Sequence, residues 1–253
     1  MERSYWNKIA ENYEDEIFEV FKNDSNSLVT KRIKKYANTK GNANDLGCGI
    51  GSFIPHLSSH FKHVSAIDIS SKCIARAKIK CSALRNVTYT TVDMAKPRAT
   101  LPMADFALSV NSIITPSLKD RIAIFNTICK NIKIGGHLVL VVPSLESVML
   151  SDARLIEWNL RKKMTPSTAV KAGLKSHRQS DTPELNQGNV KIDGVATKHY
   201  LAEELGIILE SRGMKVLEIE KIQYSWDTEF EKPPKWMKAP FPWDWLCVAK
   251  KVS

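Results

Sequence analysis

The sequence predicts an α/β protein with a doubly wound, mainly parallel sheet, and three observations lead to that expectation. Short apolar segments alternate with amphipathic ones between residues 43 and 143, and such alternation implies right-handed strand–helix–strand units. A glycine-rich turn directly follows the first of these apolar segments. The length of 253 residues suits one large domain, or one domain with a sizeable insertion.

Residues 1–40 are expected to form an N-terminal helical cap. Apolar residues recur in it at steps of three and four, which is the spacing of one face of a helix. These residues are Trp6, Ile9, Tyr13, Ile17 and Val20. A lysine-rich stretch, 31–40, then leads to Gly41, where the alternation of strands and helices begins.

Between residues 43 and 110 the pattern predicts four strands and two helices. Each strand is a short apolar or β-branched run, and the second helix places Ile74, Ala77 and Cys81 on one face. The strands are expected at 43–46, 64–68, 87–92 and 106–110, and the helices at 52–61 and 70–84.

A further helix is expected from Ser117, because the segment Ser117-Leu-Lys-Asp120 is typical of a helix start. Gly135-Gly136 is expected to end this helix. A continuous apolar run at 137–142 follows and predicts a strand that is buried on both faces. The apolar face of the helix would comprise Leu118, Ile122, Phe125, Ile128 and Ile132.

Residues 144–197 interrupt the alternation. A helix is expected at 145–164, and a polar stretch then runs to about Val190. A plain loop is seldom that long, so an insertion or lid that covers the functional site is expected. A helix at 201–213 and a hairpin of strands at 215–224 and 245–250 complete the chain. The expected division is a cap (1–40), a core (41–143 and 198–253) and a substrate-covering insertion (144–197).

The net charge of +10, from 37 Lys and Arg against 27 Asp and Glu, leaves two interpretations open. One is an RNA partner, and the other is a solvated, lysine-rich surface. The second is favoured, since no aromatic residues for base stacking interleave the densest basic cluster. That cluster comprises Arg161, Lys162, Lys163, Lys171, Lys175 and Arg178.

Five scattered cysteines without a CxxC pair are typical of reduced thiols, so a cytoplasmic protein is expected. The sequence has no metal-ligand motif, and no metal is expected. The N-terminus lacks the pattern of a signal peptide, and the longest apolar run, near 137–145, is too short to span a bilayer. No membrane partner is therefore expected.

The segment Asn44-Asp45-Leu46-Gly47-Cys48-Gly49-Ile50-Gly51 lies where the first strand turns into the first helix. Its glycines allow a tight turn, and backbone N–H groups and the helix N-terminus can approach a ligand there. The spacing differs from the GxGxxG of nicotinamide-binding proteins, whose third glycine comes one residue later. The Gly-Lys-Ser/Thr of a phosphate-binding P-loop is absent.

This GxGxG turn, with Asp45 two places before its first glycine, resembles that of class I S-adenosylmethionine-dependent methyltransferases. The resemblance covers residues 41–143 and, more loosely, 198–253. It implies S-adenosylmethionine as the cofactor, and a seven-stranded sheet in which the last hairpin supplies one antiparallel strand. The residues of the turn that would hold the cofactor are Gly47, Cys48, Gly49 and Gly51.

The resemblance also implies roles for residues that follow the second and third strands. Asp68 matches the residue that accepts hydrogen bonds from both ribose hydroxyls, and a carboxylate is a good bidentate acceptor for a diol. Asp93 matches the residue that contacts the adenine amine, and Ile69 and Met94 would sandwich the adenine ring. Taken singly, Asp68 could instead cap a helix, and Asp93 could end a strand in a turn.

Four more residues have implied roles near the reacting end of the cofactor. Asp45 matches the acid near the amino group of the cofactor, and Asn111 matches the position near its methionine end and the substrate. Tyr13, in the cap, and His199, before the helix at 201, are catalytic candidates together with Asn111, and His199 is suited to handle a proton. Packing of the cap and helix capping are the structural alternatives for these two residues.

The implied activity is methyl transfer to a small-molecule acceptor, at nitrogen, oxygen or sulfur, by in-line displacement. Positioning of the two reactants alone can lower such a barrier by roughly 7–11 kcal/mol. Two alternatives stay open: an RNA or tRNA methyltransferase, suggested by the charge, and a non-catalytic cofactor-binding subunit of another methyltransferase. The sequence leaves the acceptor and the oligomeric state open.

Overall fold

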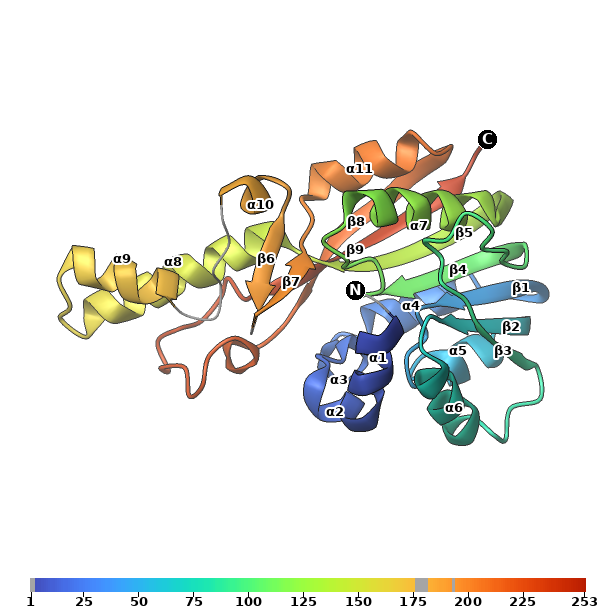
Figure 1. The fold of residues 1–253 in the computed structure, drawn as a ribbon, viewed down its shortest axis with the longest axis horizontal. Coiled ribbons are helices and arrows are strands. Elements are labelled where there is room, and N and C mark those ends of the chain that lie inside the picture. The colour runs from blue at the N-terminus through green and yellow to red at the C-terminus, as the bar shows by residue number, and fades with distance from the viewer. Residues whose placement is uncertain (1–2, 176–181, 193) are drawn as a thin grey trace.

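A seven-stranded sheet forms the centre of the molecule in the computed structural model, which describes residues 3–175, 182–192 and 194–253 (Figure 1). The strands are β1 (Asn38–Leu46), β2 (Phe61–Asp68), β3 (Val87–Thr91), β4 (Ala104–Val110), β5 (Ile132–Pro143), β8 (Met214–Gln223) and β9 (Trp243–Lys251). Their order across the sheet is β3-β2-β1-β4-β5-β9-β8. Within the described ranges, no helix is both long and apolar enough to cross a membrane.

Only β9 of the seven strands is reversed. It pairs antiparallel with β5 on one side and with β8 on the other, whereas the remaining pairs are parallel. Six strands therefore share one direction, and the predicted sheet with a single antiparallel strand from the last hairpin is confirmed. The chain runs outward from β1 to β3 and then returns to β4, so the strand order reverses between β1 and β4. Ligands of open α/β sheets bind at the carboxyl ends of the strands at such a point.

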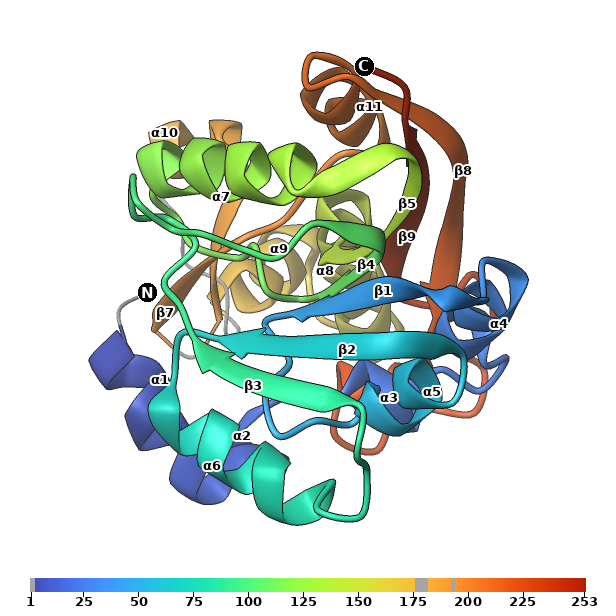
Figure 2. The same ribbon diagram turned by 90° about the vertical axis from the view of Figure 1, so that its right-hand side faces the viewer.

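Helices cover both faces of the sheet, as Figure 2 shows. On one face, α7 (Leu118–Lys130) and α11 (Ala202–Glu210) pack against a core that includes Phe125 and Leu205. On the other face lie α4 (Leu28–Lys35), α5 (Ile54–Ser58) and α6 (Ser71–Lys80). The central strand β5 is covered from both sides, and its residues Leu138 to Val142 are fully buried, which explains their continuous apolar character.

The apolar face predicted for α7 is partly wrong. Leu118 and Ile122 are 55% and 45% exposed, whereas Ile124 is buried beside Phe125 and Ile128. The start of the helix is as predicted, because the Ser117 hydroxyl accepts a hydrogen bond from the Asp120 N–H at 3.3 Å. Its end is not: the helix stops at Lys130.

Gly135 and Gly136 lie inside β5 rather than at the end of a helix. The register of β5 against β4 shifts where the two glycines stand, since Ala104 pairs with Ile132 and Phe106 with His137. Three more residues of β5 than of β4 lie between these two pairs, and Gly135 adopts a φ of 85° there. A pair of glycines can thus mark an irregularity inside a strand as well as the end of a helix.

The N-terminal cap is broken into short helices: α1 (Arg3–Ile9), a 3₁₀ turn (Ala10–Asn12), α2 (Tyr13–Glu16) and α3 (Val20–Asn23). The break follows from extended backbone at Ile17 and Glu19, which interrupts the helix that the sequence spacing predicts. Side chains of α6 hold the cap in place. The Ser70 hydroxyl donates to Asn7 Oδ1 at 2.7 Å, and Arg76 bonds the Ala10 carbonyl oxygen at 2.7 Å.

Beyond β5 the chain forms a pair of antiparallel helices, α8 (Leu145–Arg161) and α9 (Pro166–Lys175), that extends away from the sheet in Figure 1 (yellow). A short helix, α10 (Thr182–Asn186), and a hairpin of two strands, β6 (Asn189–Ile192) and β7 (Val195–Lys198), follow it. The sequence did not indicate this hairpin. Arg178, a member of the basic cluster, lies outside the described residues.

Candidate functional site

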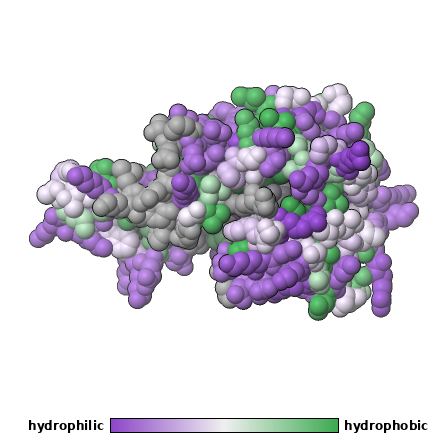
Figure 3. Space-filling model, viewed as in Figure 1, coloured by the Kyte–Doolittle hydropathy of each residue, from purple (hydrophilic) through white to green (hydrophobic). Residues whose placement is uncertain are grey.

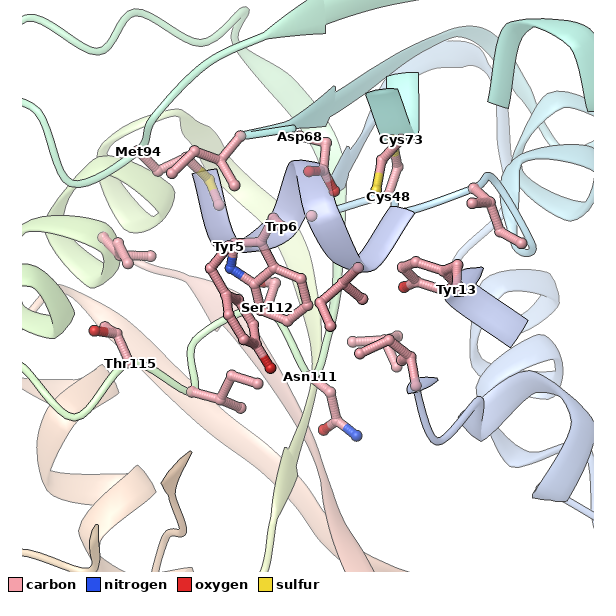
Figure 4. A pocket seen from close by; sticks show the side chains of 18 of the residues that line it. Tyr5, Trp6, Tyr13, Cys48, Asp68, Cys73, Met94, Asn111, Ser112 and Thr115 are labelled. Atoms are coloured by element: carbon pink, nitrogen blue, oxygen red, sulfur yellow. The ribbon is translucent and has the colours of Figure 1, made fainter. Parts of the chain in front are cut away.

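A cavity of about 1010 Å³ opens at the carboxyl ends of β1, β2, β4 and β5, where the strand order reverses (Figure 4). Its walls come from the glycine turn after β1, the segments after β2 to β5, the N-terminal cap and the β6–β7 hairpin. A cavity of this size lies at the upper end of the range for small-ligand sites, which is about 300–1,000 Å³. The fold therefore brings segments from across the whole chain to one ligand-sized space.

The glycine turn is closely packed against its surroundings. Gly47, Gly49 and Gly51 all have positive φ, a region that other residues rarely adopt. A Cβ atom on Gly47 would lie 2.2 Å from Ser112 Cβ, and one on Gly49 would lie 2.4 Å from the Tyr13 hydroxyl. Gly47 and Cys48 line the cavity, whereas Gly49 and Gly51 shape the turn without being part of its wall. The lack of side chains is thus required by both the backbone and its neighbours.

Asp68 joins the end of β2 to this turn. Its two carboxylate oxygens accept hydrogen bonds from the Gly49 and Ser70 N–H groups, both at 2.8 Å. Burial raises the pKa of Asp68, and the backbone hydrogen bonds act against that rise. Because each carboxylate oxygen has a second lone pair, Asp68 can still accept from ligand hydroxyls in the cavity that it lines. The structural alternative, in which Asp68 caps the following helix, is not what the structure shows: Ser70 is the cap, and its hydroxyl accepts a hydrogen bond from the Cys73 N–H.

Asp45 is a buried acid without a complete set of partners. It is 4% exposed, it lines the cavity, and its Oδ2 atom has no hydrogen-bond partner among the described residues. Burial, followed by the charge of Asp68, raises the pKa of Asp45 to about 7. A buried acceptor without a donor is costly, so a cationic donor supplied by a ligand would fit here.

The residues after β3 form another wall of the cavity. Asp93 and Met94 line it together with Ile69, which follows Asp68. Asp93 Oδ1 accepts a hydrogen bond from the Ala95 N–H at 3.0 Å. Asp93 therefore also forms the turn at the end of the strand, which was the structural alternative for this residue. The side chain is 22% exposed and keeps acceptor capacity for a ligand. The structure thus brings the three residues predicted for the adenine end to one wall.

Asn111, at the end of β4, lines the same cavity. Its φ of 48° is unusual for a residue other than glycine, although asparagine tolerates it best. Its side-chain Nδ2 donates to Asp244 Oδ2 at 3.1 Å, and the Tyr224 hydroxyl donates to the same oxygen at 2.9 Å. Sequence reasoning missed Asp244 and Tyr224. No motif marks them, since they reach the site only through the pairing of β9 with β5.

The cap covers the cavity with aromatic side chains. Tyr5 and Trp6 meet edge to face with ring centroids 5.2 Å apart, and Figure 4 shows both in front of the pocket. Tyr13 lies over Gly49. Burial, and then the charge of Asp68, raise the pKa of Tyr13 well above its ordinary value. Tyr13 is therefore a neutral phenol at physiological pH, suited to hydrogen bonding rather than to action as a base.

His199 does not line the cavity, so the structure gives no support to the predicted proton-handling role. The residue is 5% exposed, its backbone N–H donates to the Gly188 carbonyl oxygen, and its Nδ1 lies 3.0 Å from the Thr197 carbonyl oxygen. These contacts favour the structural alternative. The hairpin instead contributes Ile192, Val195 and Thr197 to the cavity wall, and none of the described wall residues is a histidine.

Comparisons with known proteins agree with this geometry. A family model described as a methyltransferase domain matches residues 44–136, which include the glycine turn, Asp68 and Asp93. No curated protein matches the sequence.

Three solved structures have similar folds. The N-methyltransferase NodS from Bradyrhizobium japonicum, in complex with S-adenosyl-L-homocysteine, is 16% identical with a TM-score of 0.56, over 90% of this chain and 86% of NodS. The DhpI–SAH complex is 17% identical with a TM-score of 0.60, over 99% and 95% of the two chains. An S-adenosylmethionine-dependent methyltransferase from Mesorhizobium loti is 18% identical with a TM-score of 0.60, over 87% and 96%. At these identities the likeness shows the fold.

Proposed function

We propose that this chain, a class I S-adenosylmethionine-dependent methyltransferase, transfers the methyl group to a small-molecule acceptor. The observation that carries the proposal is the enclosure of the cavity. The cap and the β6–β7 hairpin line the same space as the glycine turn, so the acceptor has to fit between them. When bound, S-adenosylmethionine supplies a methyl group that is already activated by a sulfonium charge.

The residues present fit this cofactor. We propose that Asp68 accepts the two ribose hydroxyls, that Asp93 contacts the adenine amine, and that Ile69 and Met94 flank the adenine ring. The amino group of the cofactor would be received by Asp45. The best support is the partnerless Oδ2 atom of Asp45, because a buried acceptor of this kind calls for a donor from outside the chain.

The charges around the cavity favour a small neutral or cationic acceptor over RNA. Two cationic side chains, Arg3 and Lys96, line it among the described residues. Six carboxylates line it as well: Glu16, Glu19, Asp45, Asp68, Asp93 and Asp120. Arg161, Lys162, Lys163 and Lys171, the members of the basic cluster whose side chains the structure describes, lie on α8, on α9 and between them, and none of the four contributes to the cavity wall. Figure 3 shows hydrophilic residues interleaved with apolar ones on this face of the molecule.

The experiment that tests the proposal combines the purified chain with cofactor labelled in its methyl group. One reaction contains a fractionated metabolite extract, and a parallel one contains total RNA at several salt concentrations. Label in a small molecule supports the proposal. Label in RNA, falling steeply with salt, would instead establish the RNA methyltransferase. Cofactor binding without any transfer would identify the non-catalytic subunit.

The binding of S-adenosylhomocysteine is expected to strengthen with pH through the titration of Asp45, whose pKa is about 7. Because the pKa of Asp45 in the folded chain is raised above 3.8, the free energy of unfolding falls as pH rises from 3.8 to about 7, and above about pH 7 the folded chain carries a buried carboxylate. An ammonium group placed beside that carboxylate offsets the cost. The ammonium of a free amino acid neighbours a carboxylate rather than an amide, so it keeps its proton above the pH of about 7.7 at which a chain terminus titrates. Affinity is expected to rise roughly eightfold from about pH 6 to about pH 7.5.

Calorimetry in buffers of different ionisation enthalpy measures both the affinity and the proton released on binding. The matched control is Asp45→Asn, which keeps the shape of the side chain and is expected to flatten the pH profile. A flat profile in the unmodified chain would show that Asp45 does not receive the amino group.

A further inference from the structure

Asn111 presents a polar atom that nothing in the described chain satisfies. Its Oδ1 atom is buried and has no hydrogen-bond partner among the described residues, although the residue lines the cavity. Buried carbonyl oxygens of side chains normally have a donor. The positive φ of Asn111 adds a backbone cost at the same residue, and such costs concentrate at ligand sites.

The orientation of the Asn111 amide is fixed by its neighbour. Nδ2 donates to Asp244 Oδ2, and a flipped amide would instead place its oxygen against that carboxylate. Asp244 is buried beside Pro143, with which it pairs in the sheet, and its Oδ2 is also held by the Tyr224 hydroxyl. Pro143 lines the cavity, whereas Asp244 and Tyr224 do not. The Asp244 carboxylate therefore binds the Asn111 amide from outside the cavity. The Asn111 Oδ1 atom stays available to accept a hydrogen bond from a ligand in the cavity.

We propose that Asn111 Oδ1 accepts a hydrogen bond from the nitrogen of an amine acceptor, and that Asp244 and Tyr224 are positioning residues that hold the amide for this purpose. The inference rests on the proposed methyl transfer and narrows its acceptor to amines. In Figure 4, Asn111 lies at the opposite end of the pocket from Met94 and Asp68, the residues assigned to the adenosine.

The chemistry of an amine matches this acceptor oxygen. As a neutral amine takes the methyl group, its lone pair forms the new N–C bond, the C–S electron pair stays on sulfur, and the positive charge moves to nitrogen. The N–H that Asn111 holds becomes a stronger donor as that charge develops, so the hydrogen bond is stronger in the transition state than before it. An amine that arrives as its ammonium gives up one proton to water before the transfer, and the product ammonium gives up the extra proton to water afterwards.

The remainder of the cavity wall agrees with an amine. The carboxylates that outnumber the cations in this wall favour a group that becomes positively charged. The edge of the Phe18 ring, also part of the wall, packs on Tyr224 with centroids 4.7 Å apart, which supports the Tyr224–Asp244 pair from the cap side.

The test compares two ligands that share adenosine and the amino-acid end. Sinefungin carries an amine where the transferred methyl group sits, and S-adenosylhomocysteine carries nothing there. Calorimetry on the full chain is expected to give about tenfold tighter binding of sinefungin, a factor in the range of a hydrogen bond to a charged group. The Asn111→Gly variant, which tolerates the positive φ, is expected to lose this preference.

The Asp244→Asn variant is expected to reduce the preference for sinefungin, because an amide at 244 no longer fixes the orientation of Asn111. Tyr224→Phe is expected to reduce it less, since the bond between Asn111 and Asp244 remains. The ratio of the two affinities cancels any general loss of folded protein. Asp105→Asn, at a carboxylate outside the cavity wall, is the control and is expected to leave the ratio unchanged.

Three results would overturn the inference in distinguishable ways. If both ligands bind and Asn111→Gly leaves both affinities unchanged, the inference fails while the methyltransferase function stands. If Asn111→Gly weakens both ligands equally, Asn111 serves their shared amino-acid end instead. If neither binds the unmodified chain, the proposed function itself fails. In the metabolite experiment, label on nitrogen supports the inference, and label on oxygen or sulfur contradicts it.

Discussion

Replacing Asp68 by alanine is expected to weaken the binding of S-adenosylhomocysteine by roughly 100-fold to 1,000-fold, which is the loss of two hydrogen bonds to a charged acceptor. The proposed partners are the two ribose hydroxyls. The same substitution also leaves the N–H groups of Gly49 and Ser70 without their acceptor. The free energy of unfolding is therefore expected to fall by about 1–3 kcal/mol as well.

Calorimetric titration gives the affinity, and denaturant unfolding gives the stability. Asp68→Asn helps to separate the loss of affinity from the loss of stability. Its single amide oxygen can still accept one backbone N–H, whereas bidentate binding of a diol is lost. Asp105→Asn, whose carboxylate accepts the Asn42 N–H away from the cavity, controls for the loss of an acid in a strand. Unchanged affinity in Asp68→Ala would refute the ribose assignment.

Replacing Gly47 by alanine is expected to cost about 2–5 kcal/mol of stability, since two penalties combine. The φ of 74° is strained for any residue with a Cβ atom. The added carbon would also lie 2.2 Å from Ser112 Cβ, an atom anchored directly to the backbone after β4. The clash could be relieved only if the glycine turn or the segment after β4 moved. Gly47 and Ser112 both line the cavity, so its wall is expected to be distorted.

Gly135→Ala is the matched control for this prediction. Gly135 has a similar φ of 85°, but a Cβ atom there would meet nothing within 4 Å. Only the conformational penalty of about 1–2 kcal/mol is expected at this position. Denaturant unfolding of the two variants isolates the effect of the close approach. Equal losses of stability would show that the contact with Ser112 is easily relieved.

Alternation of apolar and amphipathic segments predicted most of the sheet, because most of its strands bury their apolar residues and three of the helices, α6, α7 and α8, begin at a serine cap. The first and last residues of the strands were less predictable, because hydrogen bonding to the neighbouring strand determines where a strand begins and ends. β1 starts at Asn38, not at 43, and β5 starts at Ile132, ahead of the glycine pair. Ile122 was assigned to the wrong side of α7 because spacing alone does not say which side faces the core.

The candidate site was predictable where it depends on local sequence. The glycine turn, Asp45, Asp68, Asp93, Met94 and Asn111 lie close to strand ends, and the sheet brings them together. Contacts between distant segments were not predictable. The hairpin β6–β7 lies in a polar stretch with weak patterning, and the pair Asp244–Tyr224 depends on the register of three strands. His199, assigned by analogy, does not line the cavity, and its proton-handling role stays a prediction.

The reversal of β9 decides which end of the final strand meets the ligand. Parallel strands offer only their last residues to the edge where the ligand binds, whereas an antiparallel strand offers its first. Asp244 stands there for that reason, opposite Pro143, and Tyr224 arrives at the same edge as the chain leaves β8. The connection 225–242 leaves the sheet from that edge and packs along α8, where Phe230 meets Trp158 and Arg161 lies over the Trp236 ring. Its length and sequence can vary without a change of register in the sheet, because only its two ends are fixed by the pairing of β8 with β9.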